Sequence, residues 1–204
     1  MRYEHDHKDK SRSLIVRSAA AQLRAKGVDA VRLADMMQAA GMTNGGFYKH
    51  FESKDEILVE AIRCALRDVA IQLTSRVQGL PRQQALRGVI ESYLSEEHLL
   101  HPEHGCAIAA LGSELARMPL PLKRRVNDAL DAYEERLSPL MPGDSDEQRH
   151  TAYLVLFSSM AGCLTAARAE ANRKERGRIL VAGRKFFIQA FCGAAGKSSQ
   201  ETWK

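Results

Sequence analysis

The sequence is poor in the features that define several large classes of protein. Its four cysteines, Cys64, Cys106, Cys163 and Cys192, lie far apart without a CxxC pair. A disulfide scaffold is therefore not expected, and most of the thiols should be small buried hydrophobes. Aromatic residues make up only 6% of the chain. No window approaches eighteen consecutive apolar residues, so a membrane-spanning helix is not expected either.

Motifs that carry catalysis are also missing. The chain has no glycine-rich phosphate loop, no HExxH, no GxSxG and no pair of carboxylates at a suggestive spacing. Ser113 and Glu114 do not combine with His104 into a triad. We therefore expect neither an enzyme nor a cofactor. The first thirteen residues are polar and charged, without the apolar stretch of a signal peptide, so the protein should be cytoplasmic.

The pattern that is present is helical almost everywhere. With 45% hydrophobic residues in 204, the chain can bury a substantial core. No segment of alternating Val, Ile and Thr favours a strand, whereas glycine and proline separate segments with helical apolar spacing. The prediction is an all-α fold of about nine helices, at residues 10–26, 33–40, 44–50, 54–76, 82–98, 105–117, 121–138, 146–170 and 174–192.

Positive charge is concentrated at the start of the chain. The net charge is +5, and residues 1–54 contain ten Lys and Arg against six Asp and Glu, a balance of +4. A local excess of this kind fits a surface that binds phosphate groups. Taken alone, it is equally compatible with chance unevenness on a solvated face.

Residues 35–58 have the layout of a short helix, a tight turn, a second short helix and the start of a third. Gly41 supplies the positive φ that a sharp turn needs, and Met42 can fill the space between the two short helices. Thr43 is placed to cap the second helix, whose first residues are small and polar and can approach a major groove closely.

The same stretch then presents groups that can bind a DNA backbone. Lys54 lies at the start of the next helix, where backbone amides also favour a phosphate. Ser53 and Glu56 have the spacing of a capping box that would begin this helix. A phenol, an ammonium and an imidazole come just before it, on Tyr48, Lys49 and His50.

This stretch resembles the DNA-binding segment of the TetR family of bacterial regulators, whose common form is Asp-Ile-Ala-x-x-Ala-Gly-Val-Ser-x-Gly-x-Phe/Leu-Tyr-x-His/Tyr-Phe-x-x-Lys-x-x-Leu. The close match covers about fifty residues at the N-terminus. The residues that match in register are Asp35, Ala40, Gly41, Thr43 (for Ser), Gly45, Phe47, Tyr48, His50, Phe51, Lys54 and Leu58.

The resemblance implies a domain organisation and a function. Residues 1–54 would form a three-helix helix-turn-helix domain, residues 55–193 a larger ligand-binding and dimerisation domain, and residues 194–204 a flexible tail with an exposed Trp203. The protein would be a ligand-responsive transcriptional regulator. We expect a repressor that binds a palindromic operator in double-stranded DNA as a homodimer and is released by a small-molecule effector. An activator with the same fold is the alternative.

The resemblance also assigns roles to individual residues. Phe47 and Phe51 would fix the recognition helix, with Phe47 able to touch a thymine methyl group. Taken singly, Tyr48 or His50 could instead be a half-buried structural residue. The predicted DNA-binding residues are Arg32, Thr43, Asn44, Gly45, Gly46, Phe47, Tyr48, Lys49, His50 and Lys54.

Two positions depart from the family pattern. Arg32 stands where the family has a Ser or Thr that caps the second helix and can meet a phosphate. An arginine can still reach a phosphate as a cation, but it cannot cap. Met37 replaces a small alanine, which implies different packing between the helices.

The last two helices are the expected dimer interface, because a stripe of small and apolar residues runs along each of them. Pairing them with their two-fold mates would give a four-helix bundle, as in the family. The alternative is that the stripe packs only within its own subunit. The candidate residues are Leu156, Ser159, Cys163, Ala166, Ala167, Ile179, Ala182, Phe186, Phe187 and Ala190.

The middle helices are expected to enclose the effector pocket. Polar or soft groups near an apolar face give such pockets their specificity, although each of these residues could also be an ordinary core or surface residue. The candidates are Cys64, Tyr93, His98, Cys106, Glu114, Tyr133 and Tyr153. The effector would act by favouring one spacing of the two recognition helices.

Cys106 could take part in a metal site or act as a sensor of oxidants or electrophiles. His101, His104 and Cys106 are metal-ligand types, but they lie in a loop with Pro102 and Gly105 without an obvious fourth ligand, so no metal is expected. Cys106 near a helix start could also serve as a redox or electrophile sensor. A buried structural cysteine is the competing interpretation.

Overall fold

The protein folds as a bundle of helices, seen here in a computed structural model that describes the backbone of residues 2–193 and the side chains of residues 8–193. The predicted flexible tail, with Trp203, lies outside these residues. The described part contains no strand. Its helices are α1 (Arg2–Lys26), α2 (Leu33–Ala39), the 3-10 helix η1 (Asn44–Lys49), α3 (Lys54–Ser75), α4 (Arg82–Tyr93), α5 (Glu96–Leu100), η2 (Pro102–His104), α6 (Ala107–Arg117), α7 (Leu120–Leu137), η3 (Ser138–Leu140), α8 (Asp146–Ala169) and α9 (Arg173–Cys192).

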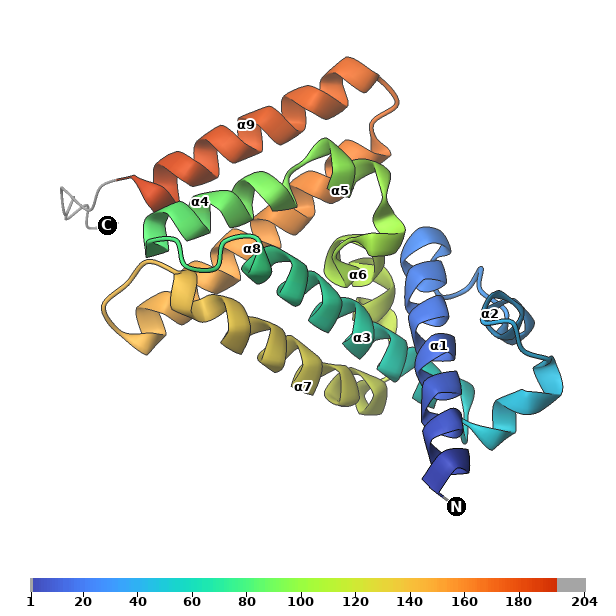
Figure 1. Ribbon diagram of the computed structural model, residues 1–204. Helices are drawn as coiled ribbons and strands as arrows, with labels where there is room; N and C mark the ends of the chain where they lie inside the picture. Colours follow the sequence, from blue (N-terminus) through green and yellow to red (C-terminus); the bar gives the residue numbers. More distant parts are fainter. Residues whose placement is uncertain (1, 194–204) are drawn as a thin grey trace.

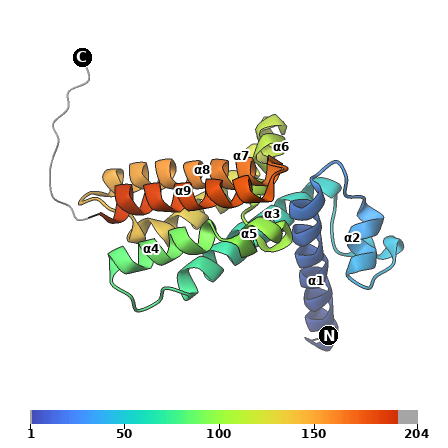
Figure 2. The same cartoon turned by 90° about the horizontal axis from the view of Figure 1, so that it is seen from above.

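The described residues confirm the predicted all-α fold, and their helices form a small unit and a large one. Figure 1 shows α1, α2 and η1 together at one end, with α3 leading from them into the larger bundle. Helix α3 packs on both α1 and α7. The apolar positions expected along it, such as Ile57, Leu66 and Leu73, are all buried. In Figure 2, α8 and α9 lie side by side along one face of the bundle.

The small unit is tied to the large one near the end of α1. Gly27 adopts the positive φ expected of a helix stop, at +84°. Immediately after it, the backbone N–H of Val28 donates to the carboxylate of Glu114 on α6, at 2.8 Å. The Arg24 side chain, only 7% exposed, donates to the carbonyl oxygens of Ala65 on α3 and Gly105 before α6. The end of α1 is therefore held by groups of the larger unit.

Two helix boundaries differ from the expected ones. Helix α1 begins at Arg2 rather than near residue 10. The helix expected over 82–98 is broken after Tyr93, because Ser95 caps a new helix by accepting the backbone N–H of His98 at 3.1 Å. Ser95 is followed by Glu96 and Glu97, a first turn typical of a helix start, so this break was visible in the sequence.

Helix α8 is more apolar than the sequence analysis implied. Within the part of the chain that the structure describes, it is the one helix long and apolar enough to cross a membrane by length and composition. Its most apolar window of 18 residues has a mean hydropathy of 1.3, and 39% of that window is buried. Helix α8 packs against α6 and α9, so we interpret it as a core helix whose outer side is also apolar.

His98 organises the connection between α4 and α6. Its Nδ1 lies 2.7 Å from the carbonyl oxygen of Tyr93, and its Nε2 lies 2.8 Å from the backbone N–H of Cys106. This pairing requires a neutral ring with the proton on Nδ1, since Nε2 must accept. Burial lowers the pKa of His98 to about 4, consistent with a ring that stays neutral at physiological pH.

We predict that the stability of the protein falls as the pH is lowered from 7 to 5. The folded-state pKa of His98, about 4, lies below the ordinary value of 6.5, so the unfolded chain binds more protons in this range. This group alone should cost about 2 kcal/mol over that range. Urea unfolding at several pH values measures the slope, which should flatten in His98→Gln and persist in His104→Gln, an exposed control. An unchanged slope in His98→Gln would contradict this account.

Candidate nucleic-acid interface

The turn between α2 and η1 has the geometry of a helix-turn-helix. Gly41 lies at φ +72°, as predicted for this turn. The backbone N–H of Met42 donates to the carbonyl oxygen of Met37 at 2.8 Å, which closes the turn. Met37 is fully buried, so its long side chain fills the space where the family pattern has alanine.

The second element is a 3-10 helix anchored from behind by two aromatic rings. Phe47 and Phe51 are 1% and 2% exposed, and their rings stack with centroids 5.3 Å apart. Tyr48, by contrast, is 77% exposed, with its ring edge-on to Phe47. The two phenylalanines thus orient the element so that its opposite side faces solvent.

Most of the predicted DNA-binding residues lie on that outer side. The exposed ones are Arg32, Thr43, Asn44, Gly45, Tyr48, Lys49 and Lys54, whereas Gly46 and His50 are half-buried. Phe47 is a correction, because a buried ring that packs on Phe51 cannot reach a thymine methyl group. Thr43 occupies the N-cap position, but its side chain makes no capping hydrogen bond, which leaves the hydroxyl free to face a ligand.

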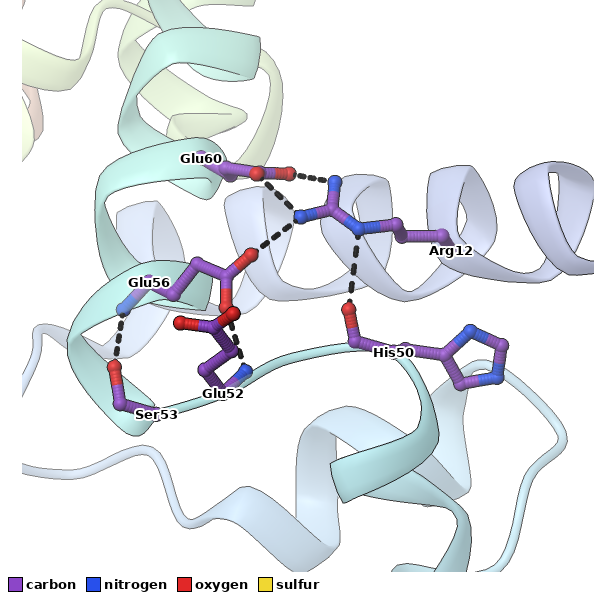
Figure 3. A network of polar contacts seen from close by, with 6 residues as sticks. All are labelled: Arg12, His50, Glu52, Ser53, Glu56 and Glu60. Atoms are coloured by element: carbon purple, nitrogen blue, oxygen red, sulfur yellow. Dashed lines mark hydrogen bonds and ion pairs between the residues drawn. The ribbon is translucent and has the colours of Figure 1, made fainter.

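Arg12 of α1, which the sequence analysis did not single out, joins the three elements of this interface (Figure 3). Its guanidinium forms a two-pronged ion pair with Glu60 and a hydrogen bond of 2.7 Å to Glu56, both on α3. Its Nε donates to the carbonyl oxygen of His50 at 3.2 Å, at the end of η1. The guanidinium also lies 4.7 Å from the centre of the Phe51 ring. Hydrogen bonding to Glu60 raises the pKa of Arg12 further.

The predicted capping box is only partly formed. Ser53 accepts the backbone N–H of Glu56 at 3.1 Å, as expected. The Glu56 carboxylate reaches back to the N–H of Glu52 rather than to that of Ser53, at 2.6 Å, and its other oxygen binds Arg12. The start of α3 is therefore fixed together with the chain that leaves η1.

His50 presents an imidazole at the edge of the same surface. Its ring points away from the Arg12 network (Figure 3), and its buried Nδ1 has no hydrogen-bond partner among the described residues. Burial lowers the pKa of His50, helped by the nearby charges of Lys8, Arg12 and Lys49. Three cations around one ring make this edge attractive to an anion such as a backbone phosphate.

Comparison with known proteins agrees with this geometry. Residues 15–61 match the N-terminal profile of the bacterial regulatory proteins of the tetR family. An uncharacterised HTH-type transcriptional regulator of Mycobacterium tuberculosis is 26% identical over 165 residues, which cover 77% of this chain and 84% of that protein. These comparisons support a regulator of the TetR family, with the family's DNA-binding segment at residues 15–61.

Solved structures of transcriptional regulators share the fold over most of the chain. A TetR-family regulator from Cytophaga hutchinsonii has a TM-score of 0.71 and 22% identity, over 91% of this chain and 96% of that one. The regulator FadR of Bacillus subtilis, solved with stearoyl-CoA, has a TM-score of 0.66 and 16% identity, over 86% and 97% of the two chains. The likeness therefore extends well beyond the matched N-terminal segment.

Arg32, the departure from the TetR pattern, leaves the start of α2 without the usual cap. Asp35 compensates in part, because its carboxylate accepts the backbone N–H of Arg32 at 3.2 Å. The Arg32 side chain itself is exposed. As a cation beside the recognition element, it can still reach a phosphate.

The residues predicted to line an effector pocket do not share one cavity. Cys64 and Tyr133 line a groove of about 1150 Å³ between α1, α3 and α7, and His98 lines a second cavity of about 280 Å³. Tyr93, Cys106 and Tyr153 line neither of these, because they are packed in the core at 0%, 2% and 8% exposure. Glu114 also lines neither, since it is directed to the backbone of Val28.

The predicted dimer stripe is partly internal to the subunit. Leu156 and Ala167 are fully buried and Phe187 is 6% exposed, so these three residues pack within their own chain. Ser159, Cys163 and Ile179 are half-buried, and Ala166, Ala182, Phe186 and Ala190 are exposed. The large exposed apolar side chains on α8 and α9 are Leu154, Val155, Val181 and Phe186.

The histidines near Cys106 do not converge on one point. His101 and His104 are exposed, at 57% and 74% of their side chains, whereas Cys106 is buried. Among the described residues no group of three or more His, Cys, Asp or Glu could hold a metal ion. Burial also keeps the Cys106 thiol from direct contact with an electrophile in solvent.

We predict that Arg12→Lys destabilises the protein although it keeps the charge. A lysine cannot reproduce the fork to Glu60 together with the bonds to Glu56 and His50, and the loss should be about 2 kcal/mol in the free energy of unfolding. Urea denaturation provides the measurement. Arg17→Lys, on the same helix but at an exposed position, is the control and should change stability little. Equal stability of the two variants would show that the network contributes nothing.

Proposed function

We propose that this TetR-family transcriptional regulator is a repressor that binds a palindromic operator as a dimer and is released by a small molecule. Residues 1–54 would bind DNA, and residues 55–193 would dimerise and bind the effector. The carrying observation is the outer side of η1, where polar and basic groups are exposed on an element that Phe47, Phe51 and Arg12 hold from behind. A rigid element whose exposed residues are small and polar is suited to enter a major groove.

Contacts around η1 separate into two kinds under this proposal. Thr43, Asn44 and the backbone of Gly45 would lie at base edges or nearby phosphates, because they are exposed at the start of the element. Tyr48, Lys49 and other groups at its rim would bind backbone phosphates, which fix register without reading sequence. Arg32 and Lys54 would add cations to this rim, and His50 would add an imidazole.

Helices α8 and α9 would form the dimer interface. Leu154 and Val155 on α8 are 50% and 52% exposed, and Val181 and Phe186 on α9 are 54% and 64% exposed. The two helices lie side by side on one face (Figure 2). Two copies of this face would form a four-helix bundle and place two recognition elements at half-sites about 34–36 Å apart.

Release by an effector requires a mechanical link between the two units, and two contacts provide one. Glu114 of α6 holds the backbone just after α1, and Arg24 of α1 reaches the carbonyl oxygen of Gly105 just before α6. A ligand that moves α6 or its preceding loop would therefore move α1 and the recognition element with it. The stearoyl-CoA complex of the structural relative FadR is an example of this fold with a bound small molecule.

We predict tight, salt-dependent binding to DNA taken from beside the protein's own gene. Tyr48→Ala should weaken binding by about tenfold or more, and Lys49→Ala should also lower the salt slope by about one. Fluorescence anisotropy across a salt series measures both. Lys174→Ala removes an exposed charge from α9 and should leave affinity and slope unchanged. Wild-type-like binding by Tyr48→Ala would mean that another face binds DNA.

We predict that Phe186→Glu produces a folded monomer. The substitution places a charge on the apolar face, and the internal contact that it removes is the edge-on one between the exposed Phe186 ring and that of Phe187. Sedimentation velocity should show a dimer for the wild type and for Leu80→Glu, an exposed apolar residue between α3 and α4. A dimeric Phe186→Glu with normal operator affinity would place the interface elsewhere.

A further inference from the structure

Two tyrosine hydroxyls are buried in the large unit without a partner. Tyr93 and Tyr133 are 0% and 4% exposed, and neither hydroxyl oxygen has a hydrogen bond among the described residues. Both hydroxyls lie against the Cys106 thiol, outside hydrogen-bond geometry. A buried hydroxyl left unpaired costs free energy, so two of them beside one thiol are unusual in a core.

Two arginine side chains without a direct ion pair lie at the same place. Arg24 and Arg168 flank the loop before α6 and donate there only to backbone carbonyl oxygens. Neither forms an ion pair with a carboxylate in the described part of the chain, and Arg168 keeps a buried Nη1 without a partner. Burial lowers the pKa of both guanidinium groups. Asp68 and Glu103 act on Arg24 from a distance, as does Glu103 on Arg168, whereas buried cations are ordinarily paired directly.

Aromatic rings form the apolar part of the cluster. The ring of Phe157 meets those of Tyr93 and Tyr133 edge-on, with centroids 5.9 and 5.7 Å away. The ring of Tyr153 lies 5.0 Å from that of Phe157 on another side. These rings are in direct contact, so a flat aromatic body could lie among them only if one of the rings, such as that of Tyr133, turned aside.

The cluster lies between the two cavities that open to the surface. Tyr133 lines the groove between α1, α3 and α7. On the other side, His98 lines the smaller cavity, and its ring is edge-on to that of Tyr93 at 4.8 Å. A rotation of Tyr133 would therefore connect the groove with the two unpaired hydroxyls.

We propose that Tyr93, Tyr133 and Arg168 form the effector site, and that the effector is a small aromatic carboxylate. Its carboxylate would accept hydrogen bonds from the two phenols and give Arg168 a direct ion-pair partner. Its ring would lie among Tyr153, Phe157 and the two phenol rings. The inference rests on the proposed effector-responsive function and specifies the chemistry of its ligand.

The position of this site explains how occupancy would reach the DNA-binding unit. Cys106, which touches both phenols, directly follows Gly105, whose carbonyl oxygen binds Arg24 of α1. The backbone N–H of Cys106 is itself held by His98. A ligand that displaces the Cys106 side chain would therefore shift the carbonyl group to which α1 is tied.

Isothermal titration calorimetry of the full chain with 2-naphthoate tests the site, with 2-naphthamide as the neutral match. We expect naphthoate to bind at least tenfold more tightly than the amide. Tyr93→Phe and Tyr133→Phe should each weaken naphthoate binding about tenfold without lowering the melting temperature, because each removes a hydroxyl that has no partner. Tyr153→Phe, whose hydroxyl is not among the unpaired ones, should bind as the wild type does.

Three results would overturn the proposal: no binding of naphthoate to the wild type, equal binding of the acid and the amide, or unchanged naphthoate affinity in the double variant Tyr93→Phe/Tyr133→Phe. DNA binding by the same preparations, measured by anisotropy without any probe, keeps this outcome separate from a failure of the repressor function. Release of bound DNA by naphthoate would further support the site.

Discussion

The recognition element η1 consists of six residues, Asn44 to Lys49, that have little capacity to hold a helix by themselves. Two of them are adjacent glycines, and a 3-10 helix of six residues forms few internal hydrogen bonds. Its position is therefore set from outside, by the stacked rings of Phe47 and Phe51 below it and by Arg12 at its end. The small residues that leave the element free to approach DNA are the reason that this external support is needed.

Arg12 connects the recognition element not only to α1, on which it lies, but also to α3. The ion pairs with Glu56 and Glu60 are only partly exposed, at about a quarter of each side chain, so solvent screens them less than it would a surface pair. Since α3 continues into the large unit, a displacement of that helix is transmitted to the end of η1 at His50. The contacts of Glu114 and Arg24 at the other end of α1 complete a two-point attachment. A unit held at two points turns as a rigid body rather than bending.

The isolated subunit has exposed apolar side chains on its outside and buried polar atoms without hydrogen-bond partners in its interior. Outside, α8 and α9 expose four large apolar side chains, which is a cost in water that a second copy would remove. Inside, the hydroxyls of Tyr93 and Tyr133 and the Nη1 of Arg168 lack hydrogen-bond partners among the described residues. The exposed apolar side chains are suited to a homodimer interface, and the unpaired buried groups are suited to binding a ligand. Both are properties of the tertiary structure, because no residue is marked in the sequence as unpaired.

The sequence by itself determined the helical class, the helix-turn-helix and the exposed polar side of its second element, because these follow from local periodicity, from Gly41 and from a motif with fixed offsets. It also placed Phe51 in the core. It could not determine which side of α8 is buried, since apolar residues surround that helix and its periodicity favours no side; Leu156 and Ala167 were assigned to the interface for this reason. Only the tertiary structure decided that Glu114 holds the end of α1 rather than a ligand, that Phe47 is inaccessible to DNA, and that Arg12 supports the recognition element. Each of these depends on contacts between residues at least 38 positions apart or on burial by other helices, and local sequence patterns carry no record of such contacts.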